Sequence, residues 1–103
     1  MTENGLPNRP LNREELLAVL REHHVFPGTF PVTVIARSDL AFYASLHAAI
    51  EELQGESSFT IEEKPSAKKN FTSYRIELYV ESAETALYRK EAIGRIDGVL
   101  VML

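Results

Sequence analysis

Apolar residues recur along this chain at two different spacings, and each change of spacing predicts a new element. From Arg13 to His24 they recur at helical intervals, and Asn12 with Glu15 resembles a capping box, which favours a short amphipathic helix. Its predicted apolar face consists of Leu16, Val19, Leu20 and His23. Pro27, Gly28 and Pro31 follow and end it.

The next two segments predict a strand and a longer helix. Phe30 to Arg37 alternates between β-branched or apolar and polar positions, which is typical of a half-buried strand. Ser38 or Asp39 can cap the helix that follows, and Gly55 is its expected C-terminal cap. The predicted inward residues are Phe30, Val32, Val34 and Ala36 in the strand and Leu40, Tyr43, Leu46, His47, Ile50 and Leu53 in the helix.

The remaining sequence predicts a hairpin, a helix and a final strand. A strand around Phe59 to Lys64 and another from Thr72 to Val80 flank the polar loop Lys64–Asn70. Ser82 can cap a third helix, and Gly98 opens the apolar strand Val99–Leu103. The predicted inward residues are Phe59, Ile61, Tyr74, Ile76, Leu78 and Val80 in the hairpin and Ala83, Ala86, Leu87, Ile93 and Ile96 after it.

After the first helix, the order of elements is β-α-β-β-α-β. Right-handed crossovers then produce an α+β fold, a ferredoxin-like two-layer sandwich whose antiparallel four-stranded sheet has the order 4-1-3-2. Residues 12–103 form a single domain in this interpretation, with 12–24 as an N-terminal helical extension whose docking site stays open. Residues 1–11 are polar and contain Pro and Gly, so we predict a disordered leader.

Composition narrows the classes of protein that remain. The 103 residues include no cysteine, which excludes disulfides and cysteine-ligated metals. The formal net charge of −4 gives no general attraction to nucleic acid or to an anionic membrane. No apolar run approaches the ~20 residues that span a bilayer, and the first residues do not resemble a signal peptide. We therefore expect a cytoplasmic protein without membrane contact.

Little in the sequence points to catalysis or to a cofactor. The histidines, His23, His24 and His47, lack the spacing of metal ligands, so no metal is expected. Neither a nucleophile elbow nor a glycine-rich phosphate loop is present. We predict a non-catalytic protein without a cofactor, and a small enzyme is the weakest alternative.

Three short motifs resemble a known family. They are Phe26-Pro27 followed by Phe30, the turn Lys64-Pro65-Ser66 followed by Asn70 and an aromatic residue, and Gly94-Arg95-Ile96-Asp97 before the last strand. Together they are similar to the YbeD-like family of small bacterial proteins, over roughly Leu16 to Leu103. The resemblance implies a ferredoxin-like fold similar to ACT domains, which regulate amino-acid metabolism, and hence a regulatory role.

The chain departs from the family pattern at two positions of the hairpin. Lys69 stands where the family usually has glycine, which argues against a positive φ or a close backbone approach there. Phe71 stands where the family usually has tyrosine, so a phenolic hydroxyl at this position cannot be essential to this protein.

The hairpin also concentrates positive charge in an acidic protein, and two interpretations are open. It can be a solvated turn, or it can recognise a small anionic ligand or the acidic surface of an unknown protein partner. The residues of this hypothetical site are Lys64, Ser66, Lys68, Lys69, Asn70, Phe71 and Ser73. Nucleic-acid binding through the basic hairpin Lys64–Arg75 is the alternative, although Tyr79 is the one aromatic residue expected on the open face of the third strand.

The final strand supplies a second candidate surface. In the predicted order it lies at a sheet edge, and it has neither a charge nor a proline to block pairing. Its residues are Val99, Leu100, Val101, Met102 and Leu103. This edge can pair with a second copy of the chain or with a partner strand, or the N-terminal helix can cover it. The function predicted is therefore that of a regulatory or adaptor domain that binds a small ligand or a protein.

Overall fold

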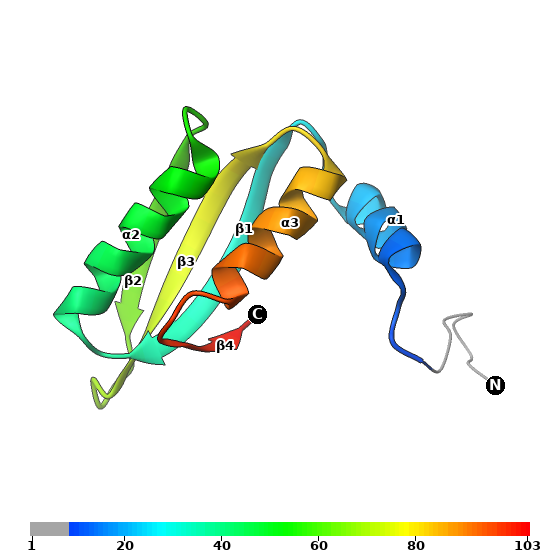
Figure 1. Ribbon diagram of the computed structural model, residues 1–103. Helices are drawn as coiled ribbons and strands as arrows, with labels where there is room; N and C mark the ends of the chain where they lie inside the picture. Colours follow the sequence, from blue (N-terminus) through cyan, green and yellow to red (C-terminus); the bar gives the residue numbers. More distant parts are fainter. Residues whose placement is uncertain (1–8) are drawn as a thin grey trace.

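A computed structural model describes residues 9–103 of the protein, and Figure 1 shows it as a sheet with helices on one side. The elements, in chain order, are α1 (Arg13–His23), β1 (Gly28–Arg37), α2 (Leu40–Gln54), β2 (Phe59–Pro65), β3 (Phe71–Val80), α3 (Ala83–Gly94) and β4 (Val99–Met102). Residues 1–8 of the predicted leader lie outside the described part.

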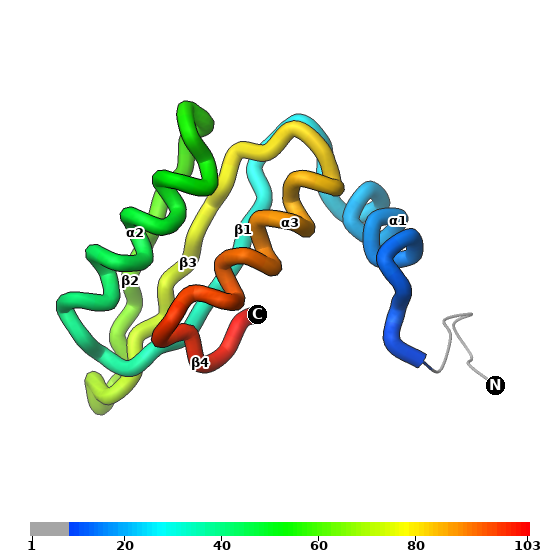
Figure 2. The backbone as a smooth tube through the Cα atoms, viewed as in Figure 1, coloured from blue at the N-terminus to red at the C-terminus, as the bar shows by residue number. Residues whose placement is uncertain are grey.

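The four strands form one antiparallel sheet in the order β2-β3-β1-β4, which confirms the predicted order 4-1-3-2 read from the opposite edge. Figure 2 traces how β1 and β3, which are distant in sequence, come to lie side by side at the centre. The helices α2 and α3 cover one face, and no helix of residues 9–103 covers the other. The α+β ferredoxin-like sandwich is therefore confirmed.

The core lies between this sheet and the two helices. Burial alternates along β1 and β3, as expected when only one face of an antiparallel sheet is covered. The inward residues of both central strands were predicted correctly, and α2 contributes Phe42, Leu46 and Ile50 to the same cluster. Complete burial of an aliphatic side chain stabilises a fold by roughly 1.5–3 kcal/mol, so this layer dominates the stability.

The predicted apolar face of α2 was partly wrong. Leu46 and Ile50 are buried, but Leu40 is 97% exposed and Phe42 takes its place against the sheet. The buried line follows residues 42, 46, 50 and 54, each four apart, because this line faces the sheet directly. Its last member, Gln54, is polar, and its side-chain amide donates to the carbonyls of Ser58 and Tyr79 at 3.0 and 2.9 Å.

Three strands are longer than predicted, and β3 is extended by Phe71 alone. β1 begins at Gly28, because Gly28 to Pro31 pair with the end of β3. β2 continues through Lys64 and Pro65, which pair with Ser73 and Thr72, so these two residues are not part of the loop. The loop is confined to residues 66–70 as a result.

The helix α1 packs against α3 at the end of the sandwich away from β4 (Figure 1). Its buried residue is Leu17, which the predicted face missed, and Leu17 contacts Ala83 and Leu87. His23 was predicted on that face but is exposed. The alternative in which this helix covers the β4 edge is therefore wrong.

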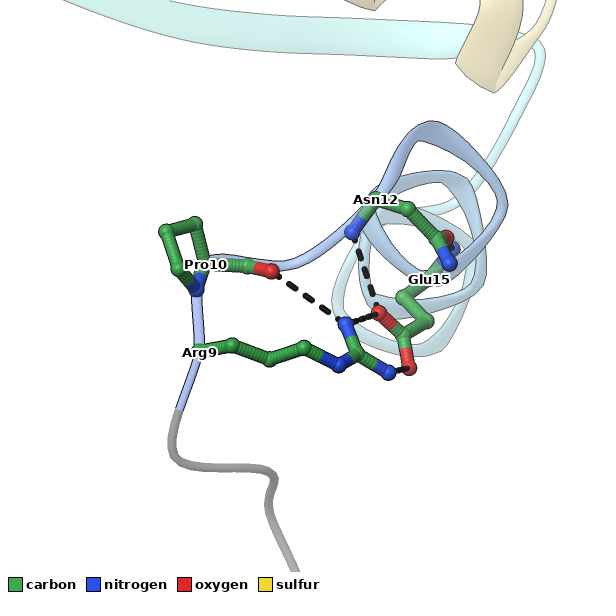
Figure 3. Close-up of polar contacts among 4 residues, drawn as sticks. All are labelled: Arg9, Pro10, Asn12 and Glu15. Carbon is green, nitrogen blue, oxygen red and sulfur yellow. Dashed lines mark hydrogen bonds and ion pairs between the residues drawn. The ribbon is translucent and has the colours of Figure 1, made fainter.

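The start of α1 has the predicted capping box, extended by Arg9 (Figure 3). The backbone N–H of Glu15 donates to the Asn12 side chain at 2.8 Å, and the Glu15 carboxylate accepts from the Asn12 backbone N–H at 3.0 Å. The Arg9 guanidinium donates to both carboxylate oxygens at 2.8 and 3.0 Å, and one of its nitrogens also reaches the Pro10 carbonyl. Hydrogen bonds from Arg9 and from the Asn12 backbone lower the pKa of Glu15 to about 2.

This lowered pKa predicts how the cap responds to acid. Because the folded pKa lies below the ordinary value of 4.5, the contribution of Glu15 to stability is present above pH 4.5 and is lost as the pH falls towards 2. An NMR titration of the Glu15 carboxyl should show a midpoint near 2. In Arg9→Gln, which keeps the capping box, the midpoint should move towards the ordinary value. Equal midpoints in the two proteins would contradict the role of Arg9.

Candidate functional site

The predicted hairpin site divides between the two faces of the sheet. Lys64 and Ser73 pair across β2 and β3 and line, with Arg75, a hollow on the open face. Lys69 instead lines a pocket on the helix-covered side. The alternation of side chains along a strand causes this division, because Lys64 lies within β2. Lys64 and Lys69 therefore do not form one basic cluster.

The other predicted hairpin residues shape the loop. The Ser66 backbone N–H donates to the Phe71 carbonyl at 2.8 Å, and the Lys69 N–H donates to the Ser66 carbonyl at 2.9 Å. The Asn70 carbonyl accepts from the backbone N–H of Ser38 at 3.0 Å, which fastens the loop to the end of β1. Lys68 is exposed in the loop.

Phe71 lies on the open face and is 39% exposed. The Arg37 guanidinium lies 5.6 Å from the centre of its ring, which is within the range of a cation–π contact. This contact uses the ring, so it does not require a hydroxyl at this position.

We call the space on the helix-covered side the hairpin–helix pocket. It has a volume of about 430 Å³ and lies where the first turn of α2 faces the β2–β3 hairpin. Its lining residues are Ser38, Asp39, Leu40, Tyr43, Glu63, Pro65, Lys69, Thr72 and Tyr74. Of these nine residues, Lys69 alone was predicted as a site residue.

The wall of this pocket is fixed by hydrogen bonds at the turn from β1 to α2. The Asp39 carboxylate caps α2 by accepting from the Ala41 N–H at 2.9 Å. The hydroxyls of Ser38 and Thr72 lie 2.9 Å apart and bond to each other. These contacts join α2, β1 and β3, so the turn and the hairpin hold a common position.

The floor of the pocket is Tyr74, which is only 2% exposed. Its ring lies 5.3 Å from that of Phe42 and 6.4 Å from that of Tyr43, centre to centre. Burial and the nearby Glu63 carboxylate raise the pKa of Tyr74 above its usual 10, against a smaller opposing effect of a hydrogen bond with Thr72. The phenol is therefore neutral at physiological pH.

The lining combines opposite charges with apolar surface. Lys69 supplies an ammonium group, Asp39 and Glu63 supply carboxylates, and Leu40 exposes almost its whole side chain. A leucine this exposed at the mouth of a pocket is available for contact with a ligand. Its position at the first residue of α2 places it beyond the part of the helix that faces the core.

Lys69 adopts a φ of 60°, so the expectation that this position avoids a positive φ was wrong. The tight loop closed by Ser66 requires the left-handed conformation here, and a lysine adopts it at a cost of roughly 1–2 kcal/mol. That conformation positions Lys69 along the pocket rather than along the path of β2.

The strain at Lys69 predicts that glycine stabilises the protein. Lys69→Gly should raise the free energy of unfolding by about 0.5–1 kcal/mol, because relief of the φ strain exceeds the entropy that glycine adds to the unfolded chain. Urea denaturation measures this difference, and Lys68→Gly in the same loop is the control, expected to bring no gain. A loss of stability in Lys69→Gly would contradict the left-handed conformation.

The predicted edge is present at β4. Leu100, Val101 and Leu103 are 51%, 46% and 68% exposed, whereas Val99 and Met102 pack against the core. β4 pairs with β1 along one side only, with a shift of register beside Ala36. Pairing of the free side with a second copy or a partner strand stays a prediction.

The architecture defines a ferredoxin-like α+β sandwich, and comparison with known proteins agrees. The family model described as "Protein of unknown function (DUF493)" matches residues 21–103, and the chain belongs to this family. The match confirms the predicted YbeD-like resemblance. No curated protein matches the chain.

Two solved structures have the same fold. The solution structure of protein HP0495 from H. pylori has a TM-score of 0.65 and 21% identity, over 78% of this chain and 85% of that chain. The ACT domain from GTP pyrophosphokinase of Chlorobium tepidum has a TM-score of 0.57 and 10% identity, over 73% and 94%. Within residues 9–103, no helix is long and apolar enough to cross a membrane.

Proposed function

We propose that this protein is a non-catalytic regulatory domain that binds a small ligand in the hairpin–helix pocket. The observation that carries the proposal is the position of Lys69 on the same 430 Å³ pocket as Asp39 and Glu63. A volume of this size is typical of small-molecule sites, which lie at roughly 300–1,000 Å³. The fold shared with an ACT domain agrees with such a role.

The charges favour a zwitterionic ligand over the purely anionic one expected from the hairpin lysines. Lys69 can hold a ligand carboxylate, whereas Asp39 and Glu63 would repel it and attract an ammonium group. Leu40 and Tyr43 offer apolar contact between these charges. A free amino acid has this combination of groups, and we propose this class of ligand.

The chemistry of the lining supports binding rather than catalysis. The pocket contains neither histidine nor cysteine, and the Ser38 hydroxyl bonds to Thr72 rather than to a base. The neutral phenol of Tyr74 can offer a hydrogen bond but has no proton-accepting role near pH 7.

A regulatory signal would pass through the contacts that join the pocket walls. Ser38 bonds to Asn70 and to Thr72, so a ligand that touches α2 and the hairpin together would stiffen both. We propose that a protein partner senses this ligand-dependent stiffening. The partner would bind by adding a strand to the apolar β4 edge.

Nucleic-acid binding by the basic hairpin has less support on the open face. Arg75 is paired with Glu77 at 3.1 Å, which reduces its availability to a phosphate. The exposed aromatic residues of β3, Phe71 and Tyr79, lie eight positions apart, roughly 26 Å along a strand, which is too far for adjacent stacked bases.

Calorimetric titration of the protein with a panel of amino acids tests the proposal. At least one member should bind, and Lys69→Met and Asp39→Asn should each weaken it about tenfold or more, because each removes one charged contact. Asparagine retains the helix cap, so Asp39→Asn separates charge from folding. Lys68→Met is the matched control and should bind like the natural protein. An affinity for the amino acid that is unchanged in both Lys69→Met and Asp39→Asn would overturn the proposal.

A further inference from the structure

A second hollow lies between α2 and α3, at the opposite end of α2 from the hairpin–helix pocket. We call it the interhelical groove; its volume is about 470 Å³. Small side chains create it, because Ala49 of α2 and Ala92 of α3 leave space between helices that lie side by side on the sheet (Figure 1). Leu53 and Ile96 add apolar lining, so the groove is able to hold an apolar body.

One cation in this groove, Arg89, has no counter-ion among residues 9–103. Arg89 projects from α3 into the lining, and none of the ion pairs within residues 9–103 involves it. Glu52 lines the same groove without coming within ion-pair distance of the guanidinium. A half-buried guanidinium is normally paired with a carboxylate, because the loss of hydration is unfavourable unless an opposite charge compensates for it.

A buried contact holds Arg89 in this position. Its Nη1 donates to the side-chain oxygen of Gln54, which is 4% exposed. The amide nitrogen of Gln54 is itself bound to the carbonyls of Ser58 and Tyr79, so the acceptor of Arg89 cannot turn away. The guanidinium is thus anchored by a neutral group, and no carboxylate of the described part of the chain balances its charge.

The other two nitrogens of the guanidinium make no hydrogen bond within residues 9–103. Its Nε is closed off from solvent and has no acceptor among the described residues. A buried N–H without a partner is unfavourable, and Nη2, which is not closed off in this way, is the nitrogen that a ligand carboxylate can reach. The protein therefore holds a positive charge with one accessible donor, Nη2, and the natural complement of such a group is a carboxylate.

We propose that the interhelical groove is a second binding site, for a small organic acid whose carboxylate pairs with Arg89 and whose apolar body lies between Ala49 and Ala92. The volume suits a small molecule. Tyr88, which is 56% exposed, stands at the rim and can close over the apolar part. This site shares no lining residue with the hairpin–helix pocket, so a test of one site does not depend on the other.

NMR titration of the isotope-labelled protein with 4-phenylbutyrate tests the site, with 4-phenylbutan-1-ol and 4-phenylbutylamine as probes of equal shape and different charge. The acid should shift the amides of Ala49, Leu53 and Ala92, and should bind about tenfold or more tightly than either control. Equal binding of the alcohol, or shifts elsewhere on the molecule, would overturn the proposal, as would the absence of any shift.

Two variants act in opposite directions. Arg89→Met should weaken the acid about tenfold, while Lys90→Met, which removes a charge from the same helix outside the groove, should leave it unchanged. Glu52→Gln should tighten binding about two- to threefold, because it removes a repelling charge without touching the Gln54 contact. If Arg89→Met does not fold, Glu52→Gln still tests the proposal. Unchanged or weaker binding of 4-phenylbutyrate to Glu52→Gln would contradict it.

Discussion

Replacement of Tyr74 by alanine should lower the free energy of unfolding by about 3–5 kcal/mol, close to the loss measured for other buried aromatic side chains. The ring is almost fully buried and contacts Phe42 and Tyr43, so its removal leaves a cavity between the sheet and α2. For a domain of this size, such a loss is a large part of the whole stability. Urea denaturation of the variant measures it.

Tyr74→Phe is the matched control, because it keeps the ring and removes the hydroxyl. It should cost less than about 1.5 kcal/mol at neutral pH. Above pH 10 the difference between the two proteins should shrink: the raised pKa of Tyr74 makes its contribution to stability fall as the pH rises past 10, and phenylalanine lacks that loss. A cost below about 1 kcal/mol for Tyr74→Ala would mean that the ring does not pack against the core.

Replacement of Gly98 by alanine should cost about 2–4 kcal/mol, from strain and overpacking together. Gly98 has a φ of 101°, which side chains rarely adopt. An added Cβ would also lie 2.8 Å from the Phe42 ring, which is buried and cannot withdraw without disturbing the core. Thermal or urea denaturation measures the loss.

Gly55→Ala is the control that separates strain from space. Gly55 also has a positive φ, of 60°, but an added Cβ would meet nothing within 4 Å. It should therefore cost about 1–2 kcal/mol, from the backbone alone. Equal losses at Gly55 and Gly98 would contradict the close packing of Gly98 against Phe42.

Local chemistry made most of the fold predictable. The caps at Asn12, Asp39 and Ser82 depend on side chains next to the backbone that they satisfy, and each is present. The alternation of buried and exposed residues along β1 and β3 was also predictable, because a sheet covered on one face requires an apolar residue at every second position.

The face of α2 was less predictable, because neighbouring helical lines both carry apolar residues. Leu40 and Phe42 each fit a stripe that includes Leu46 and Ile50, and only the position of the sheet decides between them. Packing against strands that are distant in sequence thus overrode the local pattern.

The site was predictable only in part, for a similar reason. Lys69 was predicted as a site residue from its charge. Asp39 and Glu63 line the same pocket but come from other elements, and the sequence indicated only a helix cap at Asp39. The separation of Lys64 from Lys69 follows from the extension of β2 through Pro65, whereas the residues from Lys64 to Asn70 have the pattern of a polar loop. Arg89 and Gln54, 35 residues apart, gave no sequence signal of their contact.

The measurement that tests the central claim most directly is a map of amide chemical-shift changes with the amino acid that binds most tightly. We predict changes concentrated at Ser38 to Ala41 and at Lys69 to Thr72, where α2 and the hairpin enclose the pocket. Changes confined to the open face of the sheet, around Lys64 and Arg75, would contradict the account, as would a panel in which no amino acid binds.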